Sequence, residues 1–214
     1  SVASRGLGDV YKRQSYADHV KELNNAMPDS PILFIKPPSS LIGLNDGISW
    51  NPAWGSCHFE CELVLRIDQP LKGETDPEKA LKAIGAVTLG LDLTMRDLQN
   101  DLKSKGHPWE RAKAFDGACV LADWVDTKEI TNWQETKFTF HINDELRQDG
   151  NTALLMFTIG ELLTDINQVF SLEPGDVIMT GSPAGVGPLH AGDQLKMTLK
   201  GATQDFAWET FVKA

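Results

Sequence analysis

The sequence predicts an α+β domain in which strands outnumber helices, and three features support this prediction. Residues 57–67 (CHFECELVLRI) alternate between two side-chain faces, as expected for a strand. Asp76 followed by Pro77 suits the N-cap and the first position of a helix over PEKALKAI. Near the C-terminal end, the turn sequences PGD, SPAGVGP and AGD separate short segments, a pattern typical of a β-rich architecture.

The length and composition predict one domain with a sizeable core, because the chain has 214 residues and 41% of them are hydrophobic. Residues 1–14 (SVASRGLGDVYKRQ) show no clear period and are polar, small and slightly basic. We therefore interpret residues 1–14 as a non-native leader outside the fold and residues 15–214 as a single domain.

Before the acidic strand, the sequence predicts a helix, a strand and a loop. The helical pattern begins at Tyr16 with YADHVKEL and stops before Pro28, which cannot continue a helix. The stretch ILFIKPP (32–38) is predicted to be a short strand ended by prolines. A loop rich in Gly, Asn, Asp and Trp then covers residues 41–55.

After the acidic strand, the stretch GAVTLGLDL (85–93) is predicted to be an apolar strand. A helix is expected to begin at Thr94, with Asp97 in its first turn, and to end at Gly106. Thr158 and Glu161 form the pattern of a capping box at the start of another helix.

Charge and cysteine content limit the possible partners. The net charge of −10 argues against sequence-independent nucleic-acid binding, which depends on clustered Lys and Arg. No apolar run approaches the roughly 20 residues that span a bilayer, and no secretory signal is evident, so we predict a cytoplasmic protein without a membrane partner. Cys57, Cys61 and Cys119 lack zinc-type spacing, and we expect buried free thiols.

Glu60 and Glu62 are expected on one face of the acidic strand, about 6.5 Å apart along it. Their repulsion needs an opposing charge, which could be a metal ion or a neighbouring arginine. Asp92 lies between the apolar strand and the next helix, where it could be a third ligand or a helix cap. Three carboxylates would form an all-oxygen site that suits Mg²⁺, Mn²⁺ or Ca²⁺.

Three further features could serve chemistry or be purely structural. His19 and Glu22 share a helix face, as a general base with its orienting carboxylate or as a solvated surface pair. Lys113 has apolar neighbours and could hold an anion in a pocket or be exposed. Residues 180–187 (TGSPAGVG) could bind an anion through backbone N–H groups or form a simple turn, and they lack the Gly-Lys-Ser/Thr of a P-loop.

Taken in order, these signals resemble the fumarylacetoacetate hydrolase family over nearly all of residues 16–214. The similarity is to the short, single-domain branch that contains acylpyruvate hydrolases, fumarylpyruvate hydrolases and oxaloacetate decarboxylases. It rests on the segments YADHVKE, ILFIKPPSS, HFECE, LDLTMRDLQ, KGHPWERAKAFD, INDELRQDG, LEPGDVIMTGSPAGVG and AGDQLKMTLKG.

The resemblance implies a mixed-sheet, β-roll or barrel-like fold with a few peripheral helices, and a homodimer. It also implies a cofactor, Mg²⁺ or Mn²⁺, and a small anionic 2-oxo acid as substrate. The implied site residues are the metal ligands Glu60, Glu62 and Asp92, the catalytic residues His19, Glu22 and Lys113, and the substrate contacts Gln99 and Thr180. Arg96 and Asp97 are implied as outer supports of the metal ligands.

The resemblance is incomplete at the start of the first helix. Family members enter this helix through a buried strand that ends Gly-Arg-Asn, whereas Arg13, Gln14 and Ser15 stand here. A substrate-binding arginine is thus displaced or missing, which predicts a truncated or chimeric form of the domain.

The implied activity is divalent-metal-dependent cleavage of a C–C bond in acylpyruvates, such as fumarylpyruvate or acetylpyruvate, to pyruvate and a carboxylic acid. We place this hydrolysis first because His19 and Glu22 would supply a water-activating pair. The alternatives are oxaloacetate decarboxylation, related hydratase or tautomerase chemistry on 2-oxo diacids, and a metal-binding homologue without turnover.

Overall fold

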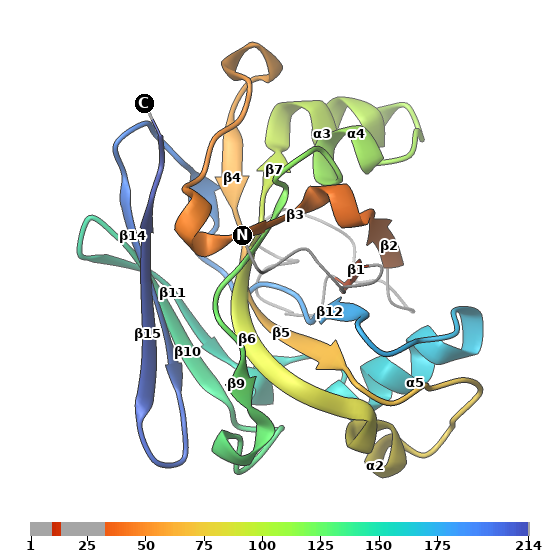
Figure 1. Ribbon diagram of the computed structural model, residues 1–214. Helices are drawn as coiled ribbons and strands as arrows, with labels where there is room; N and C mark the ends of the chain where they lie inside the picture. Colours follow the sequence, from red (N-terminus) through yellow and green to blue (C-terminus); the bar gives the residue numbers. More distant parts are fainter. Residues whose placement is uncertain (1–9, 14–32, 214) are drawn as a thin grey trace.

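The largest sheet of the protein is mixed and contains eight strands (Figure 1). The computed structural model describes residues 10–13 and 33–213. The strands follow the order β2-β1-β12-β5-β6-β8-β3, and β9 also pairs with β6. Two neighbouring pairs, β1 with β12 and β3 with β8, are parallel. The strands are β1 (Val10–Arg13), β2 (Leu33–Lys36), β3 (Leu41–Gly43), β5 (Cys61–Ile67), β6 (Ile84–Asp92), β8 (Cys119–Leu121), β9 (Val125–Asp126) and β12 (Val177–Met179).

Two smaller antiparallel sheets complete the β structure. One has the order β11-β10-β14-β15 and forms the left side of Figure 1. The other has the order β13-β4-β7. Their strands are β4 (Cys57–Phe59), β7 (Thr94–Met95), β10 (Lys137–Ile142), β11 (Glu145–Asn151), β13 (Gly187–Pro188), β14 (Gln194–Lys200) and β15 (Asp205–Phe211). The prediction of a β-rich α+β fold with a mixed sheet is confirmed. In the described part of the chain the large sheet has two ends, β2 and β3, and does not close into a barrel.

The described helices are short and lie at the periphery (Figure 1). They are α2 (Pro77–Ala80), α3 (Arg96–Ser104), α4 (Glu110–Lys113) and α5 (Ile159–Val169), with 3₁₀ turns at residues 38–40, 44–46, 52–54, 81–83, 127–129 and 152–154. Asp76 caps α2 by accepting from two backbone N–H groups, and Thr158 with Glu161 forms the predicted capping box of α5. None of the described helices is long and apolar enough to cross a membrane.

The predicted start of α3 is wrong. The N-cap is Met95, and it makes no side-chain capping bond, while Thr94 belongs to β7 and pairs with His58. The Thr94 hydroxyl is directed at Glu60 and Lys113 instead of at the helix N-terminus. The carboxylate of Asp92 contacts the buried ammonium groups of Lys36 and Lys113.

The strand β1 comes from the segment predicted to be a leader. Val10–Arg13 pairs with β2 on one side and with β12 on the other, so these four residues form part of the large sheet. A segment this short carries too few alternations for its period to be read from sequence. The helix predicted from Tyr16, and with it His19 and Glu22, lies outside the described residues.

The acidic segment predicted as one strand is two strands, which break at Glu60. The first, β4, pairs with β7 and β13, whereas β5 pairs with β6 and β12. At the break, the backbone N–H of Cys61 donates to the side chain of Gln148 at 2.9 Å. The side chain of Gln148 therefore accepts a hydrogen bond that a neighbouring strand would otherwise accept. This happens where the chain passes from one sheet to another.

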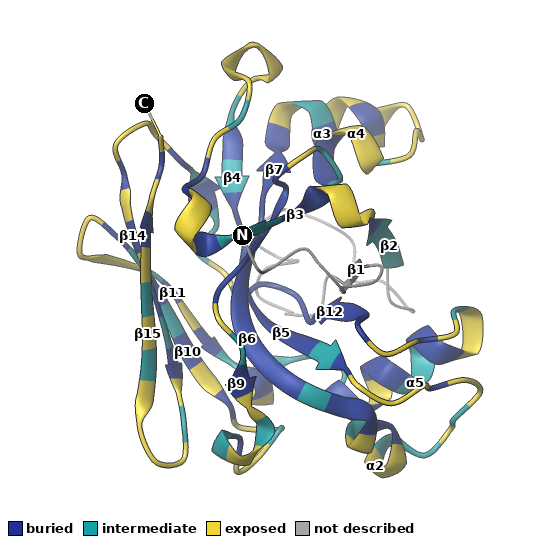
Figure 2. Ribbon diagram, viewed as in Figure 1, coloured by how far each residue is buried: buried dark blue, intermediate teal, exposed yellow. Residues whose placement is uncertain are grey.

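Both faces of β5 are buried, as the dark blue ribbon of the central strands shows (Figure 2). Leu63 and Leu65 belong to the main core, which fills the space between the sheets. Val64, on the opposite face, packs in a smaller cluster with residues of β3, β8 and β12. Glu62 shares that second face with Val64, because side chains two residues apart point to the same side. The acidic face is thus enclosed and not solvated.

Candidate functional site

Three buried carboxylates converge where β5 and β6 pair. Glu60 and Glu62 flank Cys61, which pairs with Leu91 of β6, and Asp92 ends β6. The backbone N–H of Asp92 donates to the carbonyl oxygen of Glu60 at 2.9 Å. One oxygen from each of the three side chains lies within 4.8 Å of the other two. Glu60, Glu62 and Asp92 are called the carboxylate cluster below.

Lys113 stands between two members of the cluster. Like charges directly opposite each other on paired strands destabilise a sheet unless a cation separates them. Lys113 is 1% exposed, and its Nζ donates to Glu60 Oε2 at 2.9 Å, to Asp92 Oδ2 at 2.7 Å and to Thr94 Oγ1 at 2.5 Å. Burial lowers the pKa of Lys113, and the charge of Glu60 opposes that shift. The buried side chain is thus fixed among the oxygens that it neutralises.

Arg96 holds the other oxygen of Glu60. Its guanidinium donates to Glu60 Oε1 at 2.6 Å and to Gln99 Oε1 at 2.7 Å. Since Arg96 and Gln99 lie one turn apart in α3, the helix presents both side chains to β4 and β5. Charge-assisted bonds of this kind are the strong class, so Glu60 is restrained at both oxygens.

A second buried lysine contacts the cluster from β2. Lys36 is 0% exposed, and its Nζ forms an ion pair with Asp92 Oδ1 at 2.6 Å. It also donates to the backbone carbonyls of Lys113 and Ala118. The cations Lys36, Lys113 and Arg96 therefore match the three carboxylates in number.

The turn after β12 supports Glu62. The backbone N–H of Gly181 donates to Glu62 Oε2 at 2.7 Å, and the hydroxyl of Thr180 donates to the carbonyl of Leu63 at 2.9 Å. The hydroxyl of Ser182 donates to the carbonyl of Cys61 at 3.1 Å. The backbone N–H of Gly181 thus holds a carboxylate of the protein itself.

Gln148 joins this turn to the break in the acidic segment. Its Oε1 accepts from the N–H of Cys61, and its Nε2 donates to Ser182 Oγ at 2.7 Å and to the carbonyl of Pro183 at 2.7 Å. The side chain is 1% exposed, so all these bonds form away from water. Gln148 therefore fixes the chain between the two glutamates of the cluster.

The carboxylate cluster fits a hard divalent cation. Metal–oxygen bonds of about 2.0–2.6 Å allow one ion to touch oxygens about 4–5 Å apart, and the cluster oxygens meet this condition. An all-carboxylate donor set suits Mg²⁺, Mn²⁺ or Ca²⁺ better than zinc or copper. The outer contacts from Arg96, Lys36 and Gly181 restrain the ligands, as is usual around metal sites.

A comparison with known protein families identifies the family of this chain. A family model described as fumarylacetoacetate (FAA) hydrolase C-terminal matches residues 10–205. The chain belongs to this family. The resemblance of the sequence to fumarylacetoacetate hydrolases is thereby confirmed.

Three individual proteins are similar to this chain over most of its length. Oxaloacetate tautomerase YcgM of Escherichia coli is 42% identical over 188 residues, which cover 87% of this chain and 85% of that protein. A crystal structure from Oleispira antarctica superposes with a TM-score of 0.92 at 43% identity, covering 97% of this chain and 94% of that one. Fumarylpyruvate hydrolase from Pseudomonas aeruginosa, crystallised with Mn²⁺ and pyruvate, has a TM-score of 0.87 at 25% identity, with coverages of 97% and 90%.

The structure brings together most of the residues that the family resemblance implied. Glu60, Glu62, Asp92 and Lys113 form one cluster, and Gln99 adjoins it through Arg96. Thr180 is fully buried beside β5, where its hydroxyl bonds to the backbone. Asp97, by contrast, is exposed. The roles of these residues in substrate binding and catalysis stay predictions.

His58 is a half-buried imidazole beside the cluster. Burial and the nearby charge of Arg96 lower the pKa of His58 to about 4, so its side chain is neutral at pH 7. Its Nδ1 is buried and has no hydrogen-bond partner among the described residues. His58 adds no positive charge to the site at neutral pH.

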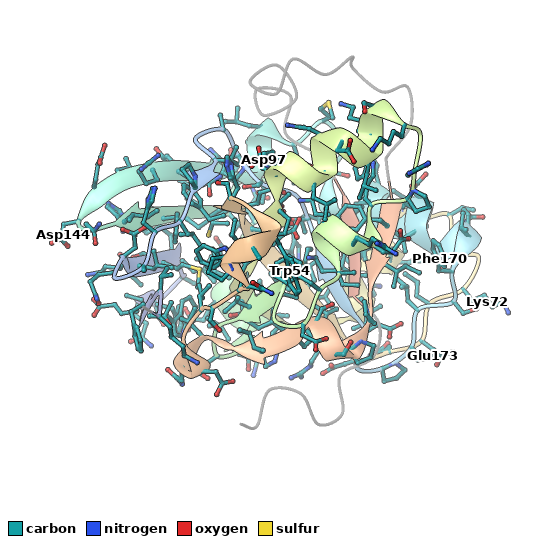
Figure 3. The ribbon with its side chains drawn as sticks, turned by 90° about the horizontal axis from the view of Figure 1, so that it is seen from above. Trp54, Lys72, Asp97, Asp144, Phe170 and Glu173 are labelled. Carbon is teal, nitrogen blue, oxygen red and sulfur yellow. The ribbon has the colours of Figure 1, made fainter. Side chains whose placement is uncertain are left out.

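An apolar cavity of about 600 Å³ adjoins the elements that carry the site. Trp54 lies on its wall beside α3 and α4, where Figure 3 labels it. Pro37, Leu98 and Ala114 also line it, and each is the chain neighbour of Lys36, Gln99 or Lys113. None of the carboxylate cluster lines this cavity, so it is a separate hydrophobic recess.

Sequence reasoning missed Lys36 and Gln148. Both lie in segments that were matched to the family, ILFIKPP and INDELRQDG, but neither was assigned a role. A lysine at the end of an otherwise apolar strand was an available signal, because lysine is seldom buried without a charged partner. Nothing in the local pattern around Gln148 marks it, since its partners are distant in sequence.

Proposed function

We propose that this protein is a divalent-metal-dependent tautomerase that interconverts the keto and enol forms of oxaloacetate-type 2-oxo dicarboxylic acids. The observation that carries the proposal is the buried cluster of Glu60, Glu62 and Asp92 with Lys113 in contact. The 42% identity to an oxaloacetate tautomerase favours this chemistry over acylpyruvate hydrolysis, which the sequence alone had placed first.

Glu60, Glu62 and Asp92 would hold Mg²⁺ or Mn²⁺. When bound, the ion supplies Lewis-acid charge to the oxygens of a 2-oxo acid. The carboxylates supply the hard oxygen ligands, and their burial excludes the water that would otherwise screen them.

Lys113 supplies a second, fixed positive charge. Removing the C3 proton of oxaloacetate sends an electron pair towards the 2-oxo oxygen, which becomes negative. An ammonium already in place stabilises this developing charge without reorganisation, an effect typically worth several kcal/mol. Delivery of a proton to that oxygen completes the enol, so the reaction moves one proton and changes no other atom.

A general base must accept the C3 proton. We assign this role to His19, oriented by Glu22, as the family resemblance implies. Tautomerisation needs only this proton transfer and an electron sink. Hydrolysis needs in addition a water molecule directed at a carbonyl carbon. The described residues supply the electron sink common to both reactions.

A coupled assay tests the proposal. The enol form of oxaloacetate is mixed with the full chain, Mg²⁺, NADH and malate dehydrogenase, which consumes the keto form. We expect NADH oxidation to be faster with the protein than without it, and EDTA or Glu60→Gln to remove the acceleration. Equal rates with and without the protein at saturating Mg²⁺ would overturn the proposal.

Acylpyruvate hydrolysis is the second candidate. It is favoured by the structural similarity of this chain to the Pseudomonas fumarylpyruvate hydrolase, which was crystallised with Mn²⁺ and pyruvate. Acetylpyruvate would then be cleaved to pyruvate and acetate, with pyruvate detected by lactate dehydrogenase. Pyruvate released from acetylpyruvate, together with no acceleration in the oxaloacetate assay, would select hydrolysis instead.

A further inference from the structure

Lys36 is an enclosed cation for which the proposed reaction has no direct use. It is the last residue of β2 and is 0% exposed. Its Nζ contacts Asp92 Oδ1 and the carbonyl oxygens of Lys113 and Ala118. All three of these contacts are with oxygens of the protein itself, and two of them are with backbone carbonyls. They join β2 to Asp92 and to the segment that carries Lys113.

Two lysines divide the carboxylate of Asp92 between them. Lys36 lies 2.6 Å from Oδ1, and Lys113 lies 2.7 Å from Oδ2. Contacts from two sides fix the rotation of the carboxylate about its Cβ–Cγ bond, which is otherwise broad. Lys36, at the end of β2, thus helps to fix the plane of the Asp92 carboxylate.

Lys36 also anchors the short helix α4. This helix has four residues, Glu110–Lys113, which is too short for stability of its own. Its C-terminal end is held to the β2 region by Lys36, which donates to the carbonyl of Lys113, and by Ser40, which donates to the carbonyl of Ala114 at 2.9 Å. The backbone that carries the Lys113 side chain is thus tied to the same ammonium as Asp92.

We infer that Lys36 is a positioning residue that orients Asp92 as a metal ligand and holds α4 in register with the carboxylate cluster. The inference rests on the proposed function, because it takes the cluster to be the divalent-metal site. It assigns Lys36 no contact with the substrate.

Two effects of removing this ammonium oppose each other, which makes the inference testable. Loss of one positive charge near three carboxylates would by itself strengthen cation binding. Loss of the contact that orients Asp92 would weaken it, and changing an outer partner of a metal ligand typically costs about 10–100-fold in metal affinity. We expect the loss of orientation to weaken cation binding by more than the loss of positive charge strengthens it.

The experiment measures Mn²⁺ affinity of the full chain by electron paramagnetic resonance of the free ion. We expect Lys36→Met to weaken binding about 10–100-fold, the range for an outer partner. Ser40→Ala is the matched control, since it removes an anchor of α4 without touching Asp92, and we expect its affinity to be unchanged. Affinity of Lys36→Met equal to or tighter than wild type would overturn the inference.

Melting temperatures separate a positioning role from a purely structural one. A lysine that only supports the fold would lower the melting temperature without metal and leave the Mn²⁺ affinity unaltered. If Lys36→Met does not fold, Lys36→Gln, which keeps an N–H donor, takes its place. Failure of both variants to fold would also contradict the inference, because the ammonium would then serve the fold as a whole.

The wild-type measurement distinguishes this inference from the proposed function. If the wild type binds no Mn²⁺, the proposed function fails. If the wild type binds Mn²⁺ and the Lys36 variant binds it equally well, the positioning role alone fails. Loss of affinity confined to the Lys36 variant supports both.

Discussion

Glu60 and Asp92 lie opposite each other, joined by a backbone hydrogen bond of 2.9 Å from the N–H of Asp92 to the carbonyl of Glu60. This pairing brings two carboxylates together in the interior, where their repulsion is poorly screened. Lys113 bridges them at 2.9 and 2.7 Å. Such a buried charge network is not required for stability, since apolar residues of similar volume would pack as well. The proposed cation site accounts for its presence.

Replacement of Lys113 should separate catalysis from metal binding. Lys113→Met removes the ammonium next to the developing enolate, and we expect tautomerase activity to fall about 100–1,000-fold, as for loss of one preorganised donor. Lys113 also contacts the proposed ligands Glu60 and Asp92, so activity is compared at Mn²⁺ concentrations that saturate each variant. Lys105→Met is the control, since Lys105 is an exposed residue at the C-terminal end of α3 and pairs with Asp101 among the described residues. Full activity in Lys113→Met would rule out its assigned role.

Gln148 should contribute to stability through its buried bonds. Gln148→Leu leaves the N–H of Cys61 and the groups at Ser182 and Pro183 without this partner. We expect the free energy of unfolding to fall by about 1–3 kcal/mol for unsatisfied buried groups. Urea denaturation measures the change, with the exposed Gln204→Leu as the matched control. Equal midpoints for the two variants would show that the Gln148 bonds add nothing.

Gly185 should tolerate no side chain, because two separate constraints act there. Its φ is +99°, and a Cβ would lie 2.0 Å from the carbonyl oxygen of Arg147. Gly192, with φ +88° and no atom within 4 Å of such a Cβ, shares only the first constraint. Thermal or urea unfolding of Gly185→Ala should show a loss about 1–3 kcal/mol larger than that of Gly192→Ala, the cost of overpacking. Similar losses of stability in the two variants would show that the backbone at Arg147 shifts to make room for the added methyl group.

Local sequence signals predicted the N-caps of α2 and α5 correctly and the start of α3 wrongly. Asp76 caps α2, and Thr158 with Glu161 caps α5, because each capping bond joins residues close in sequence. Thr94 carried a similar signal, but its hydroxyl is taken by Lys113 and Glu60, and the helix begins after Met95. A tertiary contact thus overrode a local preference.

The alternation of residues 57–67 correctly placed Glu60 and Glu62 near one point but did not reveal the break between β4 and β5. At that break the N–H of Cys61 donates to Gln148, whose position relative to Cys61 only the folded chain defines. The same holds for Lys36, which contacts Asp92 although β2 and β6 are not neighbours in the large sheet. Family resemblance supplied the members of the carboxylate cluster, whereas the supports around them required the structure.

The three cysteines should be inert in the folded protein. Cys57, Cys61 and Cys119 are buried and free, as predicted, and burial raises the pKa of Cys57 to about 12. Only the thiolate reacts with alkylating reagents, so a raised pKa and lack of access both slow the reaction. We expect no thiol to react with Ellman's reagent at pH 8 before denaturation and all three to react afterwards. Rapid modification of the native protein would show that a thiol is accessible.

Isothermal titration calorimetry with Mn²⁺ decides whether Glu60, Glu62 and Asp92 together bind one divalent ion. We expect one ion per chain in the wild type, and at least a tenfold loss of affinity in Glu60→Gln, Glu62→Gln and Asp92→Asn, since each removes a charged ligand. The exposed Glu173→Gln, whose residue lies at the edge of the molecule in Figure 3, should bind as the wild type does. Wild-type affinity in all three cluster variants, or no binding by the wild type, would rule out a metal site at these carboxylates.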